Sequence, residues 1–221
     1  MPETDHSDGA WPAGFDASDY DALLFDLDGT LVDTMALHGR AYGEVFADLG
    51  YRLTMEDYLA GIGPPARVAI RSYARAAGMG EIDDKMVGDI HGLKKIRFSK
   101  VLARDGARAL PASRLMAKWT GRLATAVVSS GNRDGVQRIL DHMGWTASLG
   151  AVVTGDDTAE GKPAPAPYLR AASLLKVAPG RCLAFEDTPG GVAAARAAGM
   201  DVIDVTRPGV IHRRTVRAGA E

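Results

Sequence analysis

The chain has 221 residues, of which 46% are hydrophobic and 24% are charged, as in an ordinary globular protein. Its 26 basic and 28 acidic residues give a formal net charge of -2, so composition offers no reason to expect nucleic acid or an anionic membrane as a partner. The single cysteine, Cys182, excludes an internal disulfide. No apolar run approaches the length of a membrane span.

Residues 1–19 are acidic and rich in Gly, Pro and Ser. They lack the basic and apolar regions of a secretory signal, so we interpret them as a flexible leader and expect a cytoplasmic protein. The last dozen residues are basic, and we expect them to form a solvated tail.

The first predicted strand is Ala22–Phe25, a short aliphatic run bounded by polar residues. From residue 35 to residue 108 only helical periodicity follows, in pieces such as 36–49, 67–77 and 82–102. A connection of this length exceeds what one crossover helix needs. We therefore predict an all-helical domain over residues 35–108, inserted into a core formed by 20–34 and 109–221.

Beyond the insertion, strand-like and helical segments alternate. The predicted strands are Ala124–Val128, 182–185 and 202–205, with Ala151–Val153 as a weaker one, and the predicted helices are 133–143, 164–175 and 190–198. Short aliphatic runs are typical of strands covered on both faces. The alternation predicts an α/β fold with a doubly wound parallel sheet and right-handed crossovers.

Two aspartates, Asp26 and Asp28, directly follow the first strand. In an open parallel sheet, ligands bind outside the carboxyl ends of the strands. Residues two apart point the same way along an extended backbone, so both carboxylates are expected to reach one site. Alone, two acids before a glycine are weak evidence, because Asp and Gly are common turn residues.

Polar residues also follow three other predicted strands. Ser129 and Ser130 lead into a helix, Lys162 precedes the next helix, and Glu186 and Asp187 follow the run 182–185. Each group has an ordinary explanation as a helix cap, a surface lysine or favourable charge at a helix N-terminus. Together at one sheet edge, however, they would bind Mg²⁺ through oxygen ligands, neutralise a phosphoryl group and supply a nucleophile.

As an ordered set, these segments resemble the four motifs of the haloacid dehalogenase superfamily. The motifs are Asp26-Leu27-Asp28-Gly29-Thr30, Ser129, Gly161-Lys162-Pro163 and Phe185-Glu186-Asp187. Within the superfamily the chain is similar to the group containing β-phosphoglucomutase and small sugar-phosphate phosphatases, over roughly residues 21–205. The resemblance implies a Rossmann-like core with an all-helical cap domain, and a Mg²⁺-dependent phosphatase acting on a small phosphomonoester.

The resemblance also implies individual roles. Asp26 resembles the nucleophile that becomes an aspartyl phosphate, and Asp28 resembles the general acid that protonates the leaving oxygen and then activates water. An acid at position 28 argues against true dehalogenase chemistry. The remaining roles are phosphate binding by Ser129, Ser130 and Lys162, and Mg²⁺ binding by Asp26, Asp28 through its carbonyl, and Asp187, with Glu186 as a ligand or a supporting partner.

In the inserted domain, His38, Arg67 and either Lys94 or Lys95 resemble cap residues that contact the substrate. One departure stands in the core: the family usually has an aspartate where this chain has Ala166. That acid supports the loop carrying the lysine, so its absence leaves the support of Lys162 to be explained.

Three functions are compatible with these motifs. We favour hydrolysis of a sugar phosphate over a β-phosphoglucomutase-like phosphomutase, because phosphatases are the more numerous among similar proteins. A non-catalytic binding module on the same fold is a third alternative, against which the intact Asp26, Asp28, Lys162 and Asp187 argue. The expected partner is a small phosphomonoester, and the protein is expected to be a monomer or a homodimer.

Overall fold

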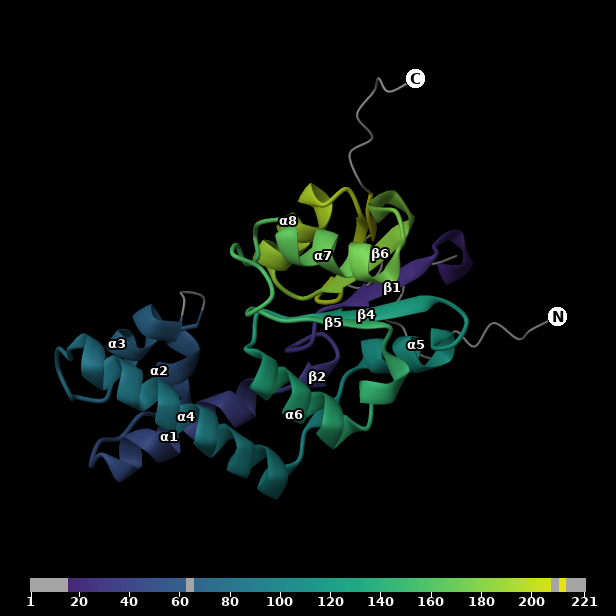
Figure 1. Ribbon diagram of the computed structural model, residues 1–221. Helices are drawn as coiled ribbons and strands as arrows, with labels where there is room; N and C mark the ends of the chain where they lie inside the picture. Colours follow the sequence, from purple (N-terminus) through teal and green to yellow (C-terminus); the bar gives the residue numbers. More distant parts are fainter. Residues whose placement is uncertain (1–15, 63–65, 208–210, 214–221) are drawn as a thin grey trace. The chain divides into compact units, whose positions relative to one another are not determined.

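The computed structural model describes residues 16–62, 66–207 and 211–213 (Figure 1). These residues form two compact units. One contains the described residues up to Asp33 together with those from Arg108 onward, and the other is Thr34–Ala107. The first unit carries the strands and the second is helical, so the predicted helical insertion into an α/β fold is confirmed.

The first unit contains eight strands and four α-helices among its described residues. The strands are β1 (Ala22–Phe25), β2 (Val32–Asp33), β3 (Arg108–Ala109), β4 (Ala124–Val128), β5 (Ala151–Val153), β6 (Cys182–Glu186), β7 (Asp201–Asp204) and β8 (Ile211–His212). The helices are α5 (Pro111–Trp119), α6 (Arg133–Met143), α7 (Ala166–Leu175) and α8 (Pro189–Ala197), with 3-10 turns at Ala17–Asp19, Thr146–Ser148 and Pro179–Arg181.

Six strands form the main sheet, in the order β5-β4-β1-β6-β7-β8. All neighbours are parallel except β8, which runs antiparallel to β7. Phe25 at the end of β1 lies opposite Val127 on one side and Phe185 on the other. The chain therefore winds outward from β1 in both directions. In sheets of this kind, ligands bind beyond the carboxyl ends of the strands at such a switch point.

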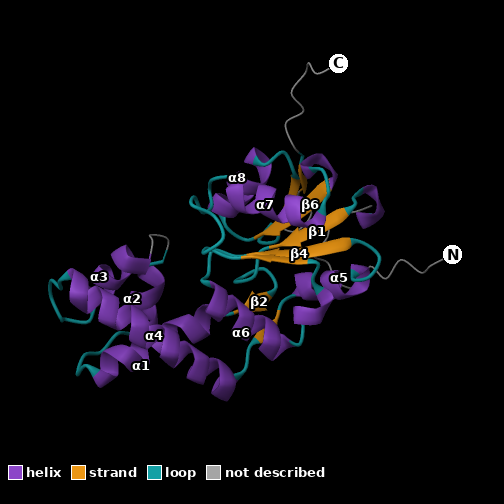
Figure 2. Ribbon diagram, in the orientation of Figure 1, coloured by secondary structure: helices purple, strands orange, loops and turns teal. Residues whose placement is uncertain are grey.

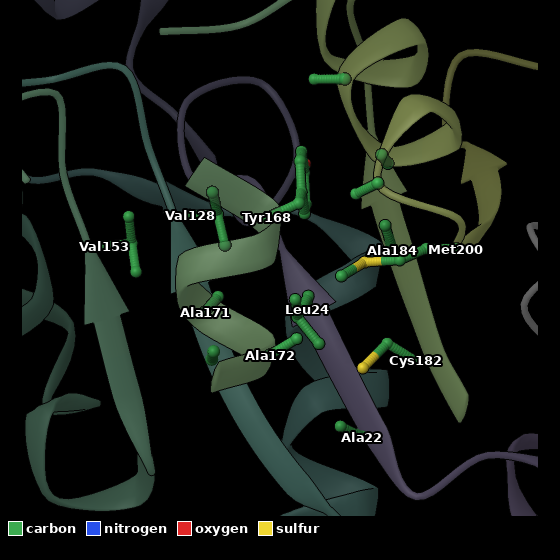
Figure 3. Close-up of a cluster of buried hydrophobic side chains, with 14 of the residues drawn as sticks. Ala22, Leu24, Val128, Val153, Tyr168, Ala171, Ala172, Cys182, Ala184 and Met200 are labelled. Carbon is green, nitrogen blue, oxygen red and sulfur yellow. The ribbon is translucent and has the colours of Figure 1, made fainter. Parts of the chain in front are cut away.

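Helices cover both faces of this sheet. Figure 2 shows α7 and α8 on one face and α5 and α6 on the other. Under α7, the fully buried Leu24 belongs to an apolar cluster with Ala171, Ala172 and Ala184 (Figure 3). Alanines at these helix positions let the helix backbone approach the strands closely. Replacing Leu24 by alanine would cost about 2–5 kcal/mol, because the close-packed surroundings collapse only partly into the space left behind.

The second unit consists of α1 (Met35–Asp48), α2 (Met55–Ala60), α3 (Ala66–Ala76) and α4 (Asp84–Asp105). Its core gathers the rings of Tyr42, Tyr58 and Tyr73, with centroids 5.0 to 6.0 Å apart. The short α2, not resolved by periodicity, begins with a capping box in which Thr54 and Asp57 satisfy each other's backbone N–H groups. Although α4 has 22 residues, no helix in the described part of the chain is long and apolar enough to cross a membrane.

The chain ends differ from the sequence-based interpretation where they are described. Of the leader, residues 1–15 lie outside the described residues, but Ala17 is fully buried. In the predicted tail, the described residues 211–213 are attached to the sheet: β8 pairs with β7, and the exposed Arg213 has its Nη1 3.1 Å from Asp201 Oδ2. The buried Asp201 contacts both segments, because it also accepts a hydrogen bond of 2.9 Å from the Tyr20 hydroxyl.

Replacing Tyr20 by phenylalanine should lower the free energy of unfolding by about 1.5–3 kcal/mol, because the buried Asp201 carboxylate loses a donor. Burial and Asp201 raise the pKa of Tyr20 from 10.0 to about 12. Between pH 10 and about pH 12 the native state therefore retains the phenol proton of Tyr20, whereas the unfolded chain has lost it. The stabilisation is therefore complete below about pH 10 and falls as pH rises from 10 to 12. Urea denaturation of both proteins across this range measures the difference.

Tyr51→Phe is the matched control, since the half-buried Tyr51 has no hydroxyl hydrogen bond to any described residue. Its effect should stay within about 0.5 kcal/mol. Equal losses in the two variants would contradict a specific contribution of the bond to Asp201.

Candidate active site

Asp26 and Asp28 lie in the turn that leaves the central strand β1. The backbone N–H of Asp26 donates to Phe185 O at 3.0 Å, so its main chain remains attached to β6. A tight turn then forms, with the N–H of Gly29 bonded to Val32 O at 2.8 Å. Gly29 has φ +90°, a conformation that favours glycine over any residue with a Cβ. Sheet and turn together hold the two aspartates at the carboxyl end of the sheet.

Lys162 reaches the same place from the loop before α7. Its side chain is 7% exposed, and its ammonium group donates to three acceptors: Asp26 Oδ1 at 2.7 Å, Glu186 Oε1 at 2.6 Å and the carbonyl of Val128 at 2.8 Å. An ammonium group has three N–H donors, so all are in use. A phosphoryl oxygen would therefore bind Lys162 by exchanging with one of these acceptors.

Glu186, the last residue of β6, is fully buried and accepts hydrogen bonds on both oxygens. Oε1 accepts from Lys162 Nζ and, at 2.7 Å, from the Tyr168 hydroxyl. Oε2 accepts from the backbone N–H of Asp187 at 3.2 Å and from the backbone N–H and hydroxyl of Thr188 at 3.4 and 3.2 Å. With five donors around it, this carboxylate is held in one orientation.

Two glycines leave room for the acids of the fourth motif. A Cβ on Gly29 would lie 2.1 Å from Asp187 Oδ2, and one on Gly191 would lie 1.9 Å from Glu186 Oε1. Real Cβ atoms do not approach other atoms this closely. Gly29 and Gly191 are therefore part of the space that Asp187 and Glu186 occupy.

Ser129 follows β4 and contacts the second aspartate. Its hydroxyl lies 3.4 Å from Asp28 Oδ2 and accepts the backbone N–H of Gly131 at 3.0 Å. Ser129 is buried, whereas Ser130, also predicted to bind phosphate, is exposed. The first, second, third and fourth motifs thus meet through Asp26, Asp28, Ser129, Lys162, Glu186 and Asp187.

Negative charge exceeds positive charge in this cluster. Burial raises the pKa of Asp26 well above its usual range, against the opposing effect of Lys162 and with the help of the Glu186 and Asp187 carboxylates. Burial and then Glu186 raise the pKa of Asp187 to about 6. Although burial disfavours the ammonium form of Lys162, Asp26 and Glu186 raise its pKa overall, so it remains charged.

The residues fit a divalent cation. Asp26, Glu186 and Asp187 each offer a carboxylate oxygen, all within 4.8 Å of one another. Asp26 Oδ2 is buried and has no hydrogen-bond partner among the described residues. A cation with oxygen ligands would satisfy this atom and offset the surplus charge. Because Glu186 is already saturated by protein donors, Asp26 and Asp187 are the better placed ligands.

The other predicted residues belong to the helical unit. His38 Nδ1 lies 2.7 Å from Lys94 Nζ, and the His38 ring stacks on Phe98 at a centroid distance of 4.3 Å. Lys95 and Arg67 are exposed. The predicted substrate loop before Arg67 is described only in part, because residues 63–65 lie outside the described residues.

Sequence reasoning missed two residues that the structure brings into these groups. Burial lowers the pKa of His91, as do the positive charges of Lys95, Lys94 and Arg67, which places His91 among the predicted cap residues. The second is Tyr168, whose hydroxyl binds Glu186. The only signal for Tyr168 was a phenol on the otherwise apolar buried face of a predicted helix. Its contacts also answer the question raised by Ala166, since Lys162 is supported without an acid there.

Comparisons with known proteins identify the family of the chain. A family model described as haloacid dehalogenase-like hydrolase matches residues 20–199. Fructose-1-phosphate phosphatase YqaB of Escherichia coli is 32% identical over 188 residues, covering 84% of this chain and 96% of that protein. Crystal structures of CbbY from Rhodobacter sphaeroides, one with phosphate and one of a mutant with xylulose-(1,5)bisphosphate, are similar with TM-scores of 0.73 and 0.72. Both are 30% identical and cover 83% of this chain and 84% of theirs.

Replacing Gly191 by alanine should displace Glu186 and lower both stability and hydrolytic activity, because the new methyl group overlaps the carboxylate. Overpacking of this kind costs about 1–3 kcal/mol. Urea denaturation and turnover of p-nitrophenyl phosphate measure the two effects. The neighbouring Gly190 is the matched control, since a Cβ there meets nothing within 4 Å. A Gly191→Ala protein as stable and active as Gly190→Ala would show that Glu186 has room to move.

Proposed function

The chain belongs to the haloacid dehalogenase-like hydrolases and is a phosphoric monoester hydrolase of that family; from this we propose that it hydrolyses a sugar phosphate through an aspartyl phosphate on Asp26. The resemblance found in the four motifs is thereby confirmed at the level of the family. The substrate and the residue roles are our proposal.

One observation carries this proposal: the two oxygens of Asp26 are unequal. Oδ1 is bound to Lys162 at 2.7 Å, whereas Oδ2 is buried with no hydrogen-bond partner among the described residues. A carboxylate held through one oxygen presents the other in a defined direction. Asp26 Oδ2 is therefore available to attack phosphorus or to bind a cation, as a covalent mechanism requires.

The proposed reaction has two steps. In the first, a carboxylate oxygen of Asp26 forms a bond to phosphorus, the bond from phosphorus to the sugar oxygen breaks, and Asp28 donates a proton to the leaving oxygen. In the second, Asp28 takes a proton from water, the water oxygen bonds to phosphorus, and the bond to Asp26 breaks. Contact with the Ser129 hydroxyl at 3.4 Å supports this use of Asp28, because it helps to hold the carboxylate beside Asp26.

We propose Mg²⁺ as the cofactor, held by Asp26, the carbonyl of Asp28 and Asp187, with Glu186 in support. When bound, the ion neutralises negative charge on the phosphoryl oxygens. Lys162 supplies a further positive charge beside Asp26. Ser129 and Ser130 are proposed to bind phosphoryl oxygens, of which the buried Ser129 is nearer the aspartates in the described contacts.

For substrate selection we propose the positively charged residues of the helical unit. Lys94 Nζ lies beside His38 Nδ1 and 5.0 and 5.2 Å from the ring centroids of Phe98 and Tyr42. Arg67 and Lys95 add two exposed charges near His91. Groups of this kind suit the hydroxyl-rich or anionic end of a sugar phosphate. The named activity of YqaB toward fructose 1-phosphate supports the same substrate class.

Asp26→Asn should abolish phosphate release from sugar phosphates, with a loss of roughly a thousandfold or more, because an amide is not a competent nucleophile. EDTA should abolish the activity of the wild type, and added Mg²⁺ should restore it. Release of inorganic phosphate from a panel of sugar phosphates measures both effects. The exposed Asp134 provides a control, since Asp134→Asn changes the same charge away from the cluster. Turnover persisting in Asp26→Asn would rule out the covalent mechanism.

Arg67→Ala should reduce kcat/KM on a sugar phosphate far more than on p-nitrophenyl phosphate, which lacks a polar distal group. Loss of one charge-assisted contact corresponds to about 1.5–3 kcal/mol, or roughly ten- to a hundredfold. Arg52→Ala is the control, because Arg52 is an exposed arginine of the same unit. Equal losses on both substrates would place Arg67 at the reacting phosphate or in folding.

The same assay distinguishes the second proposed activity. Conversion of β-glucose 1-phosphate to glucose 6-phosphate without release of free phosphate would identify a phosphomutase instead of a phosphatase.

A further inference from the structure

Tyr168 is a polar side chain inside an apolar layer. It is fully buried on α7, in the cluster that includes Leu24, Val128 and Ala171 (Figure 3). A buried phenol hydroxyl requires a hydrogen-bond partner, since leaving it unpaired costs free energy. The partner here is Glu186 Oε1, at 2.7 Å. The only hydrogen bond found for this hydroxyl in the described structure therefore ends on a carboxylate of the candidate active site.

Tyr168 also contacts Lys162 in two ways. Lys162 Nζ donates to the same oxygen, Glu186 Oε1, at 2.6 Å. It also lies 5.2 Å from the centroid of the Tyr168 ring, within the range of a cation–π contact. The hydroxyl thus orients the acceptor of Lys162, and the ring contacts the ammonium group itself.

These contacts lead to Asp26. Lys162 Nζ bridges Glu186 Oε1 and Asp26 Oδ1, so the position of the ammonium group determines which Asp26 oxygen is bound and which one remains free. Without the Tyr168 hydroxyl, Glu186 Oε1 would retain Lys162 as its only donor among the described residues. The ammonium group would then be drawn toward Glu186 and its bond to Asp26 would lengthen.

We propose that Tyr168 is a positioning residue that orients Lys162 through Glu186 and thereby aligns Asp26 for attack on phosphorus. The inference rests on the proposed covalent function of Asp26. Tyr168 contacts neither phosphate nor the reacting atoms in this scheme, and acts through Lys162.

The test compares Tyr168→Phe with Tyr20→Phe. Each variant keeps its ring and removes one buried phenol hydroxyl bound to a carboxylate. The partners differ: the Tyr20 hydroxyl binds Asp201 and Arg213, which are not residues of the candidate active site. We expect kcat on p-nitrophenyl phosphate at saturating Mg²⁺ to fall about tenfold in Tyr168→Phe, as for one lost hydrogen bond to a charged group. KM should change less than twofold, and Tyr20→Phe should retain the wild-type kcat.

A double-mutant cycle separates positioning from a general loss of packing. In a Lys162→Ala background, where residual turnover is followed at high enzyme concentration, Tyr168→Phe should cause no further loss of kcat. If the kcat losses of the two single variants multiplied in the double variant, Tyr168 would act independently of Lys162 and the inference would be overturned. Urea denaturation of each variant checks that the assays are made on folded protein.

The outcomes also separate this inference from the proposed function. If the wild type is active and Tyr168→Phe has an unchanged kcat, only the proposed role of Tyr168 is refuted. An active wild type whose turnover persists in Asp26→Asn would instead refute the covalent function, and with it the alignment that Tyr168 is proposed to provide.

Discussion

The buried ammonium group of Lys162 is the contact on which the arrangement of the active-site acids depends. It lies between Asp26 and Glu186, with a side-chain exposure of 7%, and its third donor binds a backbone carbonyl. Burying charges is costly, and the cost is offset only where geometry is good and the remaining donors and acceptors are satisfied. Both conditions hold for Lys162. They also explain why the carboxylates gather so closely without mutual repulsion dispersing them.

The parallel sheet brings these groups together from distant parts of the chain. Because β1 is flanked by β4 and β6 in parallel register, the residues that follow all three strands emerge at one edge. Asp26, Ser129 and Asp187 are therefore neighbours although more than a hundred residues separate the first from the others. The side chains at this edge are closely packed, because a Cβ on Gly29 or Gly191 would overlap a carboxylate. Small residues are as necessary to the site as charged ones.

The helical unit contributes a different kind of chemistry. Three tyrosine rings pack in its interior, and ion pairs such as Arg97 with Glu44 link its helices at the surface. Positively charged side chains gather around His38, Lys94 and His91. The core unit thus carries the acids and a lysine for reaction at phosphorus. The helical unit carries cations suited to the remainder of a substrate, which is the division that we propose between chemistry and selection.

Local sequence patterns determined the order of strands and helices and the place of the helical insertion. Aliphatic runs and helical periodicity predicted the alternating strands and helices and the helical insertion, because side-chain period is a local property of the chain. The positions of Asp26 and Asp187 at strand ends, and of Lys162 before a helix, followed from the same patterns. The short helices α2 and α5 and the strand β8 were not recognised, since they are short or their boundaries are set by contacts elsewhere.

Only the tertiary structure decided which side chains satisfy one another. The bond from Tyr20 to Asp201 spans 181 residues, and no local sequence pattern around either residue predicts the contact. Tyr168 was readable as one more apolar position on α7, yet its hydroxyl completes Glu186 across 18 residues of chain. Periodicity reports which face of an element is buried. It does not report which donor meets which acceptor there, because that depends on how elements distant in sequence pack.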